Sequence, residues 1–248
     1  MSSASPLLTR NFRELESVVD YHVKVNKVAQ GDYKTCHIGC LARGKEDPDF
    51  IKTEYGIPVI ITRIQEAIFE TLKPDEAVKF FASFPPAVSC DGKDLTRVGW
   101  QFLASELRNL PKVESDIQAV IDPVIEGLDL LAAGKPWPEA ISAVRAIRPA
   151  ANSARAAANS ARAAAEAAEA AGIAATRFYS LYSDYAASYA ADATHHVADA
   201  AFLAAPYTAA DASACASACA NPTARAATRL RQRDTLLKLI SEAPVRGN

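Results

Sequence analysis

The sequence predicts an all-α protein, a mostly antiparallel multi-helix bundle whose alanine-rich C-terminal half is closely packed. Glycine is scarce, at 10 of 248 residues, whereas the helix-favouring residues alanine, leucine, glutamate and arginine are common. Apolar residues recur at spacings of three and four, and no segment shows the alternation typical of strands. Proline, glycine and capping residues then divide the chain into segments of helical length.

Capping residues and helical spacing predict a series of helices in the first half of the chain. Asp47 is suited to cap a helix that begins at Pro48, and Gly56 is suited to end it. The Pro85-Pro86 pair is expected to end a helix over 75–84, because proline lacks the amide hydrogen that a helix needs. The other expected helices are 12–23, a short one within 36–43 capped by Thr35 and stopped by Gly44, 58–72, 95–107 capped by Asp94, and 115–133, which is either two helices or one kinked at Pro123.

A change of composition near Trp137 predicts two regions. Before it, apolar positions are filled by isoleucine, leucine, valine and phenylalanine, and after it alanine dominates until about Asn221. We therefore expect an N-terminal helical domain over 1–134 and an alanine-rich helical region over 135–248, with a soft boundary at 134–148. An amphipathic helix from Pro222 to Ala243 is expected to pack back onto the bundle.

The alanine region contains the sequence NSARAAA twice in tandem, at 152–158 and 159–165. Its polar residues follow a spacing of three and four and so form one narrow polar stripe along a helix, with alanine on both sides. This pattern predicts a helix that neighbouring helices cover on much of its circumference. A free-standing surface helix is the alternative. One straight helix over 149–205 would be about 85 Å long, against a radius of gyration of ~18 Å for a compact chain of this size. We therefore expect a break, at Gly172, and antiparallel helices.

Composition and charge exclude several classes of protein. The formal net charge of −2 argues against a globally basic nucleic-acid binder and against a strongly acidic DNA mimic. The first residues lack the basic start and apolar run of a signal peptide, and no stretch of about twenty residues is apolar enough to span a membrane. Five cysteines in such a chain indicate reduced thiols, so we expect a cytoplasmic protein.

Several segments together resemble one family of proteins. These are "CHIGCLARG", "EYGIP", "IQEAIFE", "DGKDLTRVGWQFLASELRNLP", "IQAVIDPVIEGLDLLAAGKPWPEA", the alanine tract and the final "RQRDTLLKLISEAP". The chain resembles, over most of its length, the alanine-rich helical proteins carried by bacteriophages and prophages. That resemblance names no chemistry. By analogy with other phage proteins that lack a catalytic signature, it implies a host-takeover or counter-defence factor in the host bacterial cell, such as an anti-CRISPR protein.

Two groups of residues have the composition of a metal or acid–base site. Cysteines stand four apart at Cys36/Cys40 and again at 215/219, but structural zinc sites use CxxC in a turn, so buried thiols and no metal are expected. Asp192, His195, His196 and Asp199 could bind a metal or run acid–base chemistry, or form a solvated helix face. The chain has no HExxH, no glycine-rich phosphate loop and no GxSxG, so we expect no catalytic residues and no cofactor.

Two rows of side chains are the expected interaction residues. Tyr182, Tyr185 and Tyr189 continue a stripe that begins at Phe178, and tyrosine is a good interface anchor, although such a stripe can also fill a gap between helices. Arg225, Arg229 and Arg233 recur every four residues and suit an RNA backbone or an acidic protein surface. A solvated helix face is the alternative for the arginines.

Together with the absence of a catalytic motif, the resemblance to phage proteins implies a non-enzymatic intracellular protein that inhibits a host macromolecular complex, with a CRISPR effector as the expected target. Occlusion of a surface or displacement of a subunit would be the mode of action. The partner would be a host protein or ribonucleoprotein complex, with no membrane and no generic DNA binding. The alternatives are a sponge or enzyme acting on a defence signalling nucleotide, and a toxin-neutralising immunity protein.

Overall fold

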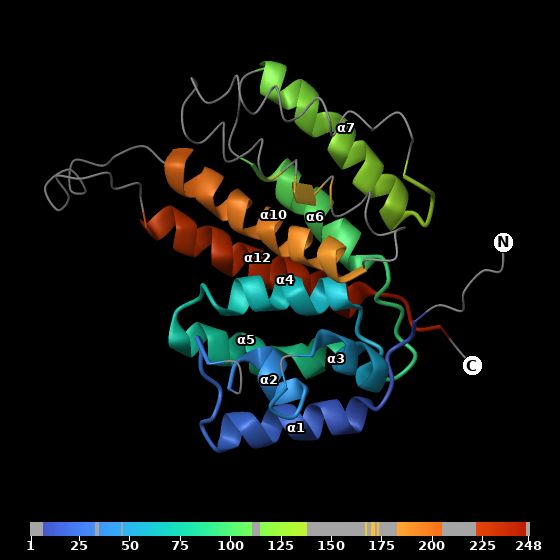
Figure 1. Ribbon diagram of the computed structural model, residues 1–248, viewed down its shortest axis with the longest axis vertical. Helices are drawn as coiled ribbons and strands as arrows, with labels where there is room; N and C mark the ends of the chain where they lie inside the picture. The colour runs from blue at the N-terminus through green and yellow to red at the C-terminus, as the bar shows by residue number, and fades with distance from the viewer. Residues whose placement is uncertain are drawn as a thin grey trace, which may run out of the picture. The chain divides into compact units, whose positions relative to one another are not determined.

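Helices make up the regular secondary structure of this protein, as seen in a computed structural model that describes residues 7–32, 35–45, 47–110, 115–137, 167, 170, 171, 173, 183–204 and 222–246. In those residues the only β pairing is a pair of isolated bridges, Leu8 with Asp94 and Lys93 with Val245. The predicted all-α fold is confirmed (Figure 1). The helices are α1 (Phe12–Lys24), α2 (His37–Leu41), α3 (Pro48–Tyr55), α4 (Val59–Phe69), α5 (Pro74–Val88), α6 (Val98–Arg108), α7 (Ser115–Ala132), α10 (Ser183–Ala204) and α12 (Pro222–Glu242).

The chain divides into two compact units. The first comprises Met1–Phe102 and Arg233–Asn248, and the second comprises Leu103–Gln232. Helices α6 and α12 therefore each contribute residues to both units. Most of the boundary region expected at 134–148 lies outside the described residues, so the division into 1–134 and 135–248 stays a prediction.

The first unit is organised around α2 and α4. Helix α2 contacts α1, α3 and α4, and α5 contacts both α1 and α4. Helix α4 is buried over most of its surface, and Ile61, Ile64 and Ile68 are fully inaccessible. That burial explains the mainly apolar composition of α4, since a helix covered on several sides has little need of a polar face.

Local capping signals placed one helix of this unit correctly and another incorrectly. The Asp47 side chain accepts a hydrogen bond from the Phe50 amide at 3.0 Å, and Gly56 ends α3 at a φ of 69°. A Cβ at Gly56 would lie 1.9 Å from the Leu8 carbonyl oxygen, so close approach also requires glycine there. Thr35 was expected to cap α2, but the cap is Cys36, whose Sγ accepts from the Gly39 amide at 3.4 Å.

The expected effect of the proline pair was wrong. Helix α5 continues through Pro85 and Pro86 to Val88, and it ends where Ser89 adopts a left-handed φ of 65°. The pair lies in the last turn, so the missing amide hydrogens interrupt the helix only near its end. Pro123 likewise lies inside a single helix, which decides between the two alternatives for α7.

Asp94 was expected to cap α6. Instead it accepts from the Thr96 amide at 3.0 Å in a turn, and α6 begins only at Val98.

Lys93 connects segments of the first unit that are far apart in the sequence. Its side chain is buried, and its Nζ donates to the carbonyl oxygens of Ala87 at 3.0 Å, Ile240 at 3.1 Å and Ser241 at 2.9 Å. These carbonyls lie in the last turns of α5 and α12, where the helix dipoles concentrate negative charge. Burial lowers the pKa of Lys93, and no carboxylate is among these acceptors, so the helix ends stabilise its charge.

The backbone around Lys93 completes this junction. The Thr9 amide donates to the Lys93 carbonyl at 2.9 Å, and the Lys93 amide donates to Thr9 Oγ1 at 2.8 Å. The Asp94 amide donates to the Pro244 carbonyl at 2.8 Å, and the Arg246 amide donates to the Gly92 carbonyl at 2.9 Å. The first and last described segments of the chain therefore meet at one loop.

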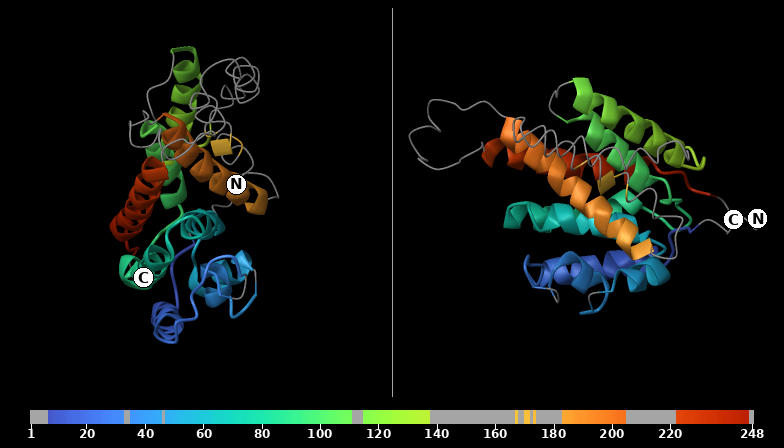
Figure 2. Two further views of the ribbon diagram at one scale, coloured as in Figure 1. Left: turned by 90° about the vertical axis from the view of Figure 1, so that its left-hand side faces the viewer. Right: turned by 45° about the horizontal axis from the view of Figure 1, so that its top comes forward.

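The second unit includes α7, α10 and adjoining parts of α6 and α12. Asp199 of α10 pairs with Arg225 of α12, while Thr194 accepts from Arg229, so these two helices run antiparallel (Figure 2). Alanines of α10 at 187, 190 and 193 are at most 1% exposed, as expected of close alanine packing. The NSARAAA repeat and the expected break at Gly172 lie outside the described residues. Within the described part of the chain, the structure contains no helix with the length and apolarity needed to cross a membrane.

Replacing Lys93 with methionine should destabilise the protein by about 2–4 kcal/mol, because the substitution leaves helix-end carbonyls buried without a donor. Urea unfolding followed by circular dichroism measures the change. The matched control is Lys45→Met at an exposed position, which should alter stability by less than about 0.5 kcal/mol. Equal effects for the two variants would show that the Lys93 hydrogen bonds do not stabilise the fold.

Replacing Ala190 with leucine should destabilise the protein by about 1–3 kcal/mol, because the larger side chain overpacks a site that is fully buried. Ala227→Leu, at an exposed position of α12, is the control. The comparison is made by thermal unfolding. A melting temperature that is unchanged in the Ala190 variant would contradict close packing around α10.

Candidate functional site

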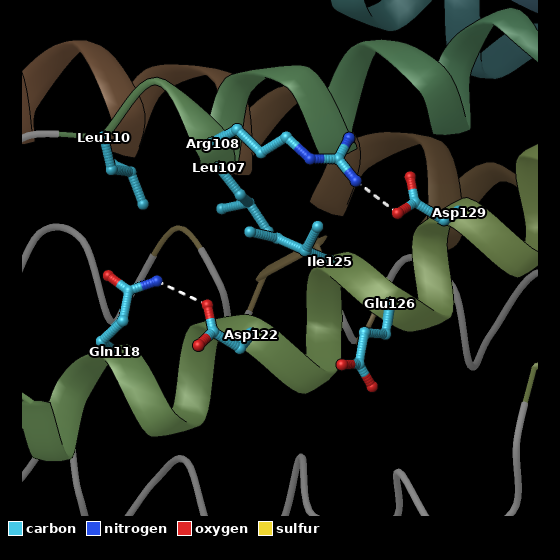
Figure 3. A pocket seen from close by; sticks show the side chains of 8 residues that line it. All are labelled: Leu107, Arg108, Leu110, Gln118, Asp122, Ile125, Glu126 and Asp129. Carbon is cyan, nitrogen blue, oxygen red and sulfur yellow. Dashed lines mark hydrogen bonds and ion pairs between the residues drawn. The ribbon is translucent and has the colours of Figure 1, made fainter.

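An open groove lies between the C-terminal end of α6 and one face of α7 (Figure 3). Its volume is about 410 Å³, which is within the range of small-ligand sites. The lining side chains from α7 lie on one face because they are spaced by three and four residues. The eight lining residues are Leu107, Arg108, Leu110, Gln118, Asp122, Ile125, Glu126 and Asp129.

The pattern of α7 explains why these side chains reach the groove. Ile121, Val124 and Leu128 are buried, and they anchor one face of the helix in the second unit. Asp122, Glu126 and Asp129 lie on the opposite, exposed face. An amphipathic helix thereby presents carboxylates to solvent, while the half-buried Ile125 and Leu110 supply apolar surface above the buried Leu107.

Two of the three carboxylates in the groove already have partners. Arg108 forms an ion pair with Asp129, and Gln118 Nε2 donates to Asp122 at 2.6 Å. Glu126 makes no hydrogen bond or ion pair with any residue that the structure describes, and Figure 3 shows its carboxylate pointing away from Asp129. Three carboxylates and one guanidinium give the groove a net charge of −2. The carbonyls at the end of α6 add partial negative charge, so the groove favours cations.

The predicted arginine row is directed mainly into the protein. Arg229 is only 2% exposed, and its guanidinium donates to the Thr194 carbonyl at 3.2 Å and to Gln232 Oε1 at 2.9 Å. Its proposed role as a surface contact is therefore corrected. The reason is the orientation of α12 about its own axis, which places Arg229 on the same buried face as Leu236 and Ile240 and leaves Leu230 half-buried.

The other arginines of α12 also engage the protein's own carboxylates. Arg225 is exposed and pairs with Asp199, while Arg233 is half-buried and lies 2.5 Å from a Glu76 oxygen. Arg231 binds Glu106 in a bidentate manner at 2.7 and 2.9 Å, although Glu106 is 1% exposed. Of the three predicted contacts in the row, Arg225 keeps the exposure that partner binding requires.

His195 belongs to the same network as Arg229. The His195 Nδ1 lies 2.8 Å from Arg229 Nη2, so the ring nitrogen acts as the acceptor. Burial, followed by the adjacent Arg229 charge, lowers the pKa of His195 to about 4, and the imidazole is neutral near pH 7. Asp199, the other acid–base candidate beside it, is paired with Arg225.

The predicted tyrosine stripe is described only in part. Tyr189 is half-buried on α10. Tyr182 and the side chain of Tyr185 lie outside the described residues, so the stripe stays a prediction.

The cysteines and the histidine of α2 are buried. Cys36 and Cys40 are 6% and 1% exposed, and burial raises the pKa of both thiols, that of Cys40 to about 12. His37 is 3% exposed, and neither ring nitrogen has a well-formed hydrogen bond. Burial outweighs the neighbouring Gln65 side chain and lowers the pKa of His37 to about 3. The raised pKa values of Cys36 and Cys40 keep both thiols protonated and poorly nucleophilic near pH 7. Cys215 and Cys219 lie outside the described residues.

No cluster of three or more histidine, cysteine or acidic side chains is placed to hold a metal ion among the residues with described positions. Comparison with known proteins gave no matching family model, no matching curated protein and no matching solved structure. The resemblance to alanine-rich phage proteins therefore stays a prediction, and the functional argument depends on the described side chains.

The stability of the protein should fall as the pH is lowered from about 6.5 to about 4, in part because of His195. Its folded pKa is about 4, below the ordinary value of 6.5, so the unfolded chain binds the proton first. Replacing His195 with glutamine should make the loss of stability between pH 6.5 and 4 shallower. Urea unfolding at a series of pH values measures it. An unchanged pH dependence would show that His195 titrates alike in both states.

Proposed function

We propose that this protein is a non-catalytic binding protein that inhibits a host macromolecular complex, as a phage counter-defence factor in the bacterial cytoplasm. The observation that carries the proposal is the open groove of α6 and α7, with its net negative charge and with Glu126, which has no partner among the residues that the structure describes. Charged surfaces of this kind speed association and select partners of opposite charge. The partner is a host protein or ribonucleoprotein complex, and a CRISPR effector is the target to test first.

The side chains that could act in catalysis, two thiols and an imidazole, are placed in a way that favours binding over catalysis. The Cys36 and Cys40 thiols are buried with raised pKa values, and His195 is held neutral as an acceptor for Arg229. Catalytic groups need access to a substrate and a pKa near the working pH. The groove, in contrast, is open to solvent.

The charge of the groove also discriminates between the alternatives. A sponge for a signalling nucleotide would have to bind phosphates, which three carboxylates repel. A toxin-neutralising immunity protein is the second candidate, because an acidic groove suits the basic surface of a nucleic-acid-cleaving toxin. In both candidates the protein acts by covering a partner's surface.

Expression of the protein in bacteria with active CRISPR immunity should raise the plaquing efficiency of a targeted phage. The double variant Asp122→Lys/Glu126→Lys should lose most of that effect, because each charge reversal weakens association by about tenfold. A panel of strains carrying different CRISPR types covers the possible effectors. The variant His195→Gln should keep the activity if the protein is not an enzyme.

The matched control is Glu16→Lys/Asp20→Lys, which reverses two exposed charges four residues apart on α1. This variant should retain the effect on plaquing. Loss of activity in the folded His195→Gln variant, with binding retained, would indicate catalysis. No effect of the wild-type protein in any strain of the panel would contradict a CRISPR target.

A further inference from the structure

The carboxylates of the groove form a row with a defined spacing. Asp122, Glu126 and Asp129 stand four and three residues apart on α7, which corresponds to steps of about 6 Å and about 4.5 Å along the helix. Figure 3 shows Ile125 pointing toward Leu107 on the other side of the groove. The groove therefore offers an acidic row next to a short apolar strip.

The interactions within the groove leave its centre available. The Arg108–Asp129 ion pair and the Gln118–Asp122 hydrogen bond orient the carboxylates at the two ends of the row. Glu126, between them, has no described partner. A cationic side chain that reaches Glu126 would thus gain a charge-assisted hydrogen bond without displacing an existing one.

The chemistry of an occupant follows from these features. It must carry positive charge to match the net −2 of the groove, and it must carry an apolar group to cover the half-buried Leu110 and Ile125. A nucleic-acid backbone has the wrong charge. A free polyamine has the right charge but no branched apolar group. A helix with basic residues four apart matches the spacing of the row, because both are α-helical repeats.

We propose that the groove binds a basic amphipathic helix of a partner protein. Two lysine or arginine side chains of that helix, four residues apart, meet Glu126 and a neighbouring carboxylate, and one apolar side chain covers the half-buried Leu110 and Ile125. This inference deepens the proposed function and rests on it, since it assigns the chemistry of the partner surface that the protein covers.

The test uses the purified full-length chain and a fluorescein-labelled, alanine-based helical peptide. The peptide carries lysines four residues apart and leucines on the adjoining face, and a second peptide has the same composition in shuffled order. Fluorescence anisotropy should show that the ordered peptide binds at least about fivefold more tightly than the shuffled one. The affinity should decrease as salt is added.

Variants locate the binding to the groove. Glu126→Lys should weaken binding of the ordered peptide by about tenfold, whereas Asp20→Lys, with the same change in net charge, should alter it by less than about twofold. Leu110→Gln tests the apolar strip and should weaken binding with little change in salt dependence. Circular dichroism confirms that each variant is folded.

Several outcomes would overturn the inference. Equal binding of the ordered and shuffled peptides, or equal effects of Glu126→Lys and Asp20→Lys, would indicate unspecific attraction to an acidic protein. Binding of spermine that matches the peptide would indicate a polyamine site, and binding of a single-stranded oligonucleotide would indicate a nucleic-acid surface. If plaquing rises but no peptide binds, only this inference fails. If the peptide binds but plaquing never changes, the proposed function fails.

Discussion

The Lys93 ammonium group, held by three main-chain carbonyls, is the interaction on which the first unit depends. A buried charge without a carboxylate partner is tolerated only when hydrogen bonds replace its hydration. Here the ends of α5 and α12 provide that replacement, and in return the charge satisfies carbonyls that a helix end leaves without donors. Fixing the last turn of α12 also fixes which of its faces is buried. Arg229, Leu236 and Ile240 lie on one face of α12 because they are spaced by seven and four residues.

The orientation of α12 about its own axis decides which of its arginines interact within the protein and which are available to a partner. Its buried face brings Arg229 to Thr194 and His195, and Arg231 beside it neutralises Glu106. These groups stabilise the second unit, and they are poorly placed to contact another molecule. The exposed carboxylates of α7 differ in that Glu126 has no internal partner among the residues described. The groove of α6 and α7 therefore carries uncompensated negative charge, although arginine is the more conspicuous charged residue in the C-terminal sequence.

Sequence reasoning succeeded where structure is decided locally. Asp47, Pro48 and Gly56 define α3 through contacts within a few residues, and all three act as predicted. It failed where distant contacts decide. Nothing near Pro85 in the sequence shows that α5 continues through it. The burial of Arg229 likewise depends on α10, which precedes it by about thirty residues in the sequence. The acidic row of α7 is visible as a spacing, but the groove also needs Leu107 of α6 and Leu110 just after that helix, and only the tertiary structure brings these residues beside α7.

Hydrogen–deuterium exchange of the protein bound to its captured host partner tests the central claim most directly. The account predicts that binding slows exchange in α7, around Asp122 and Glu126, and at the end of α6 near Leu107. Helix α1, which carries equivalent exposed carboxylates, should exchange as it does in the free protein. Protection confined to α10 and α12, or to α1, with none in α7, would contradict the assignment of the groove as the surface by which this protein acts.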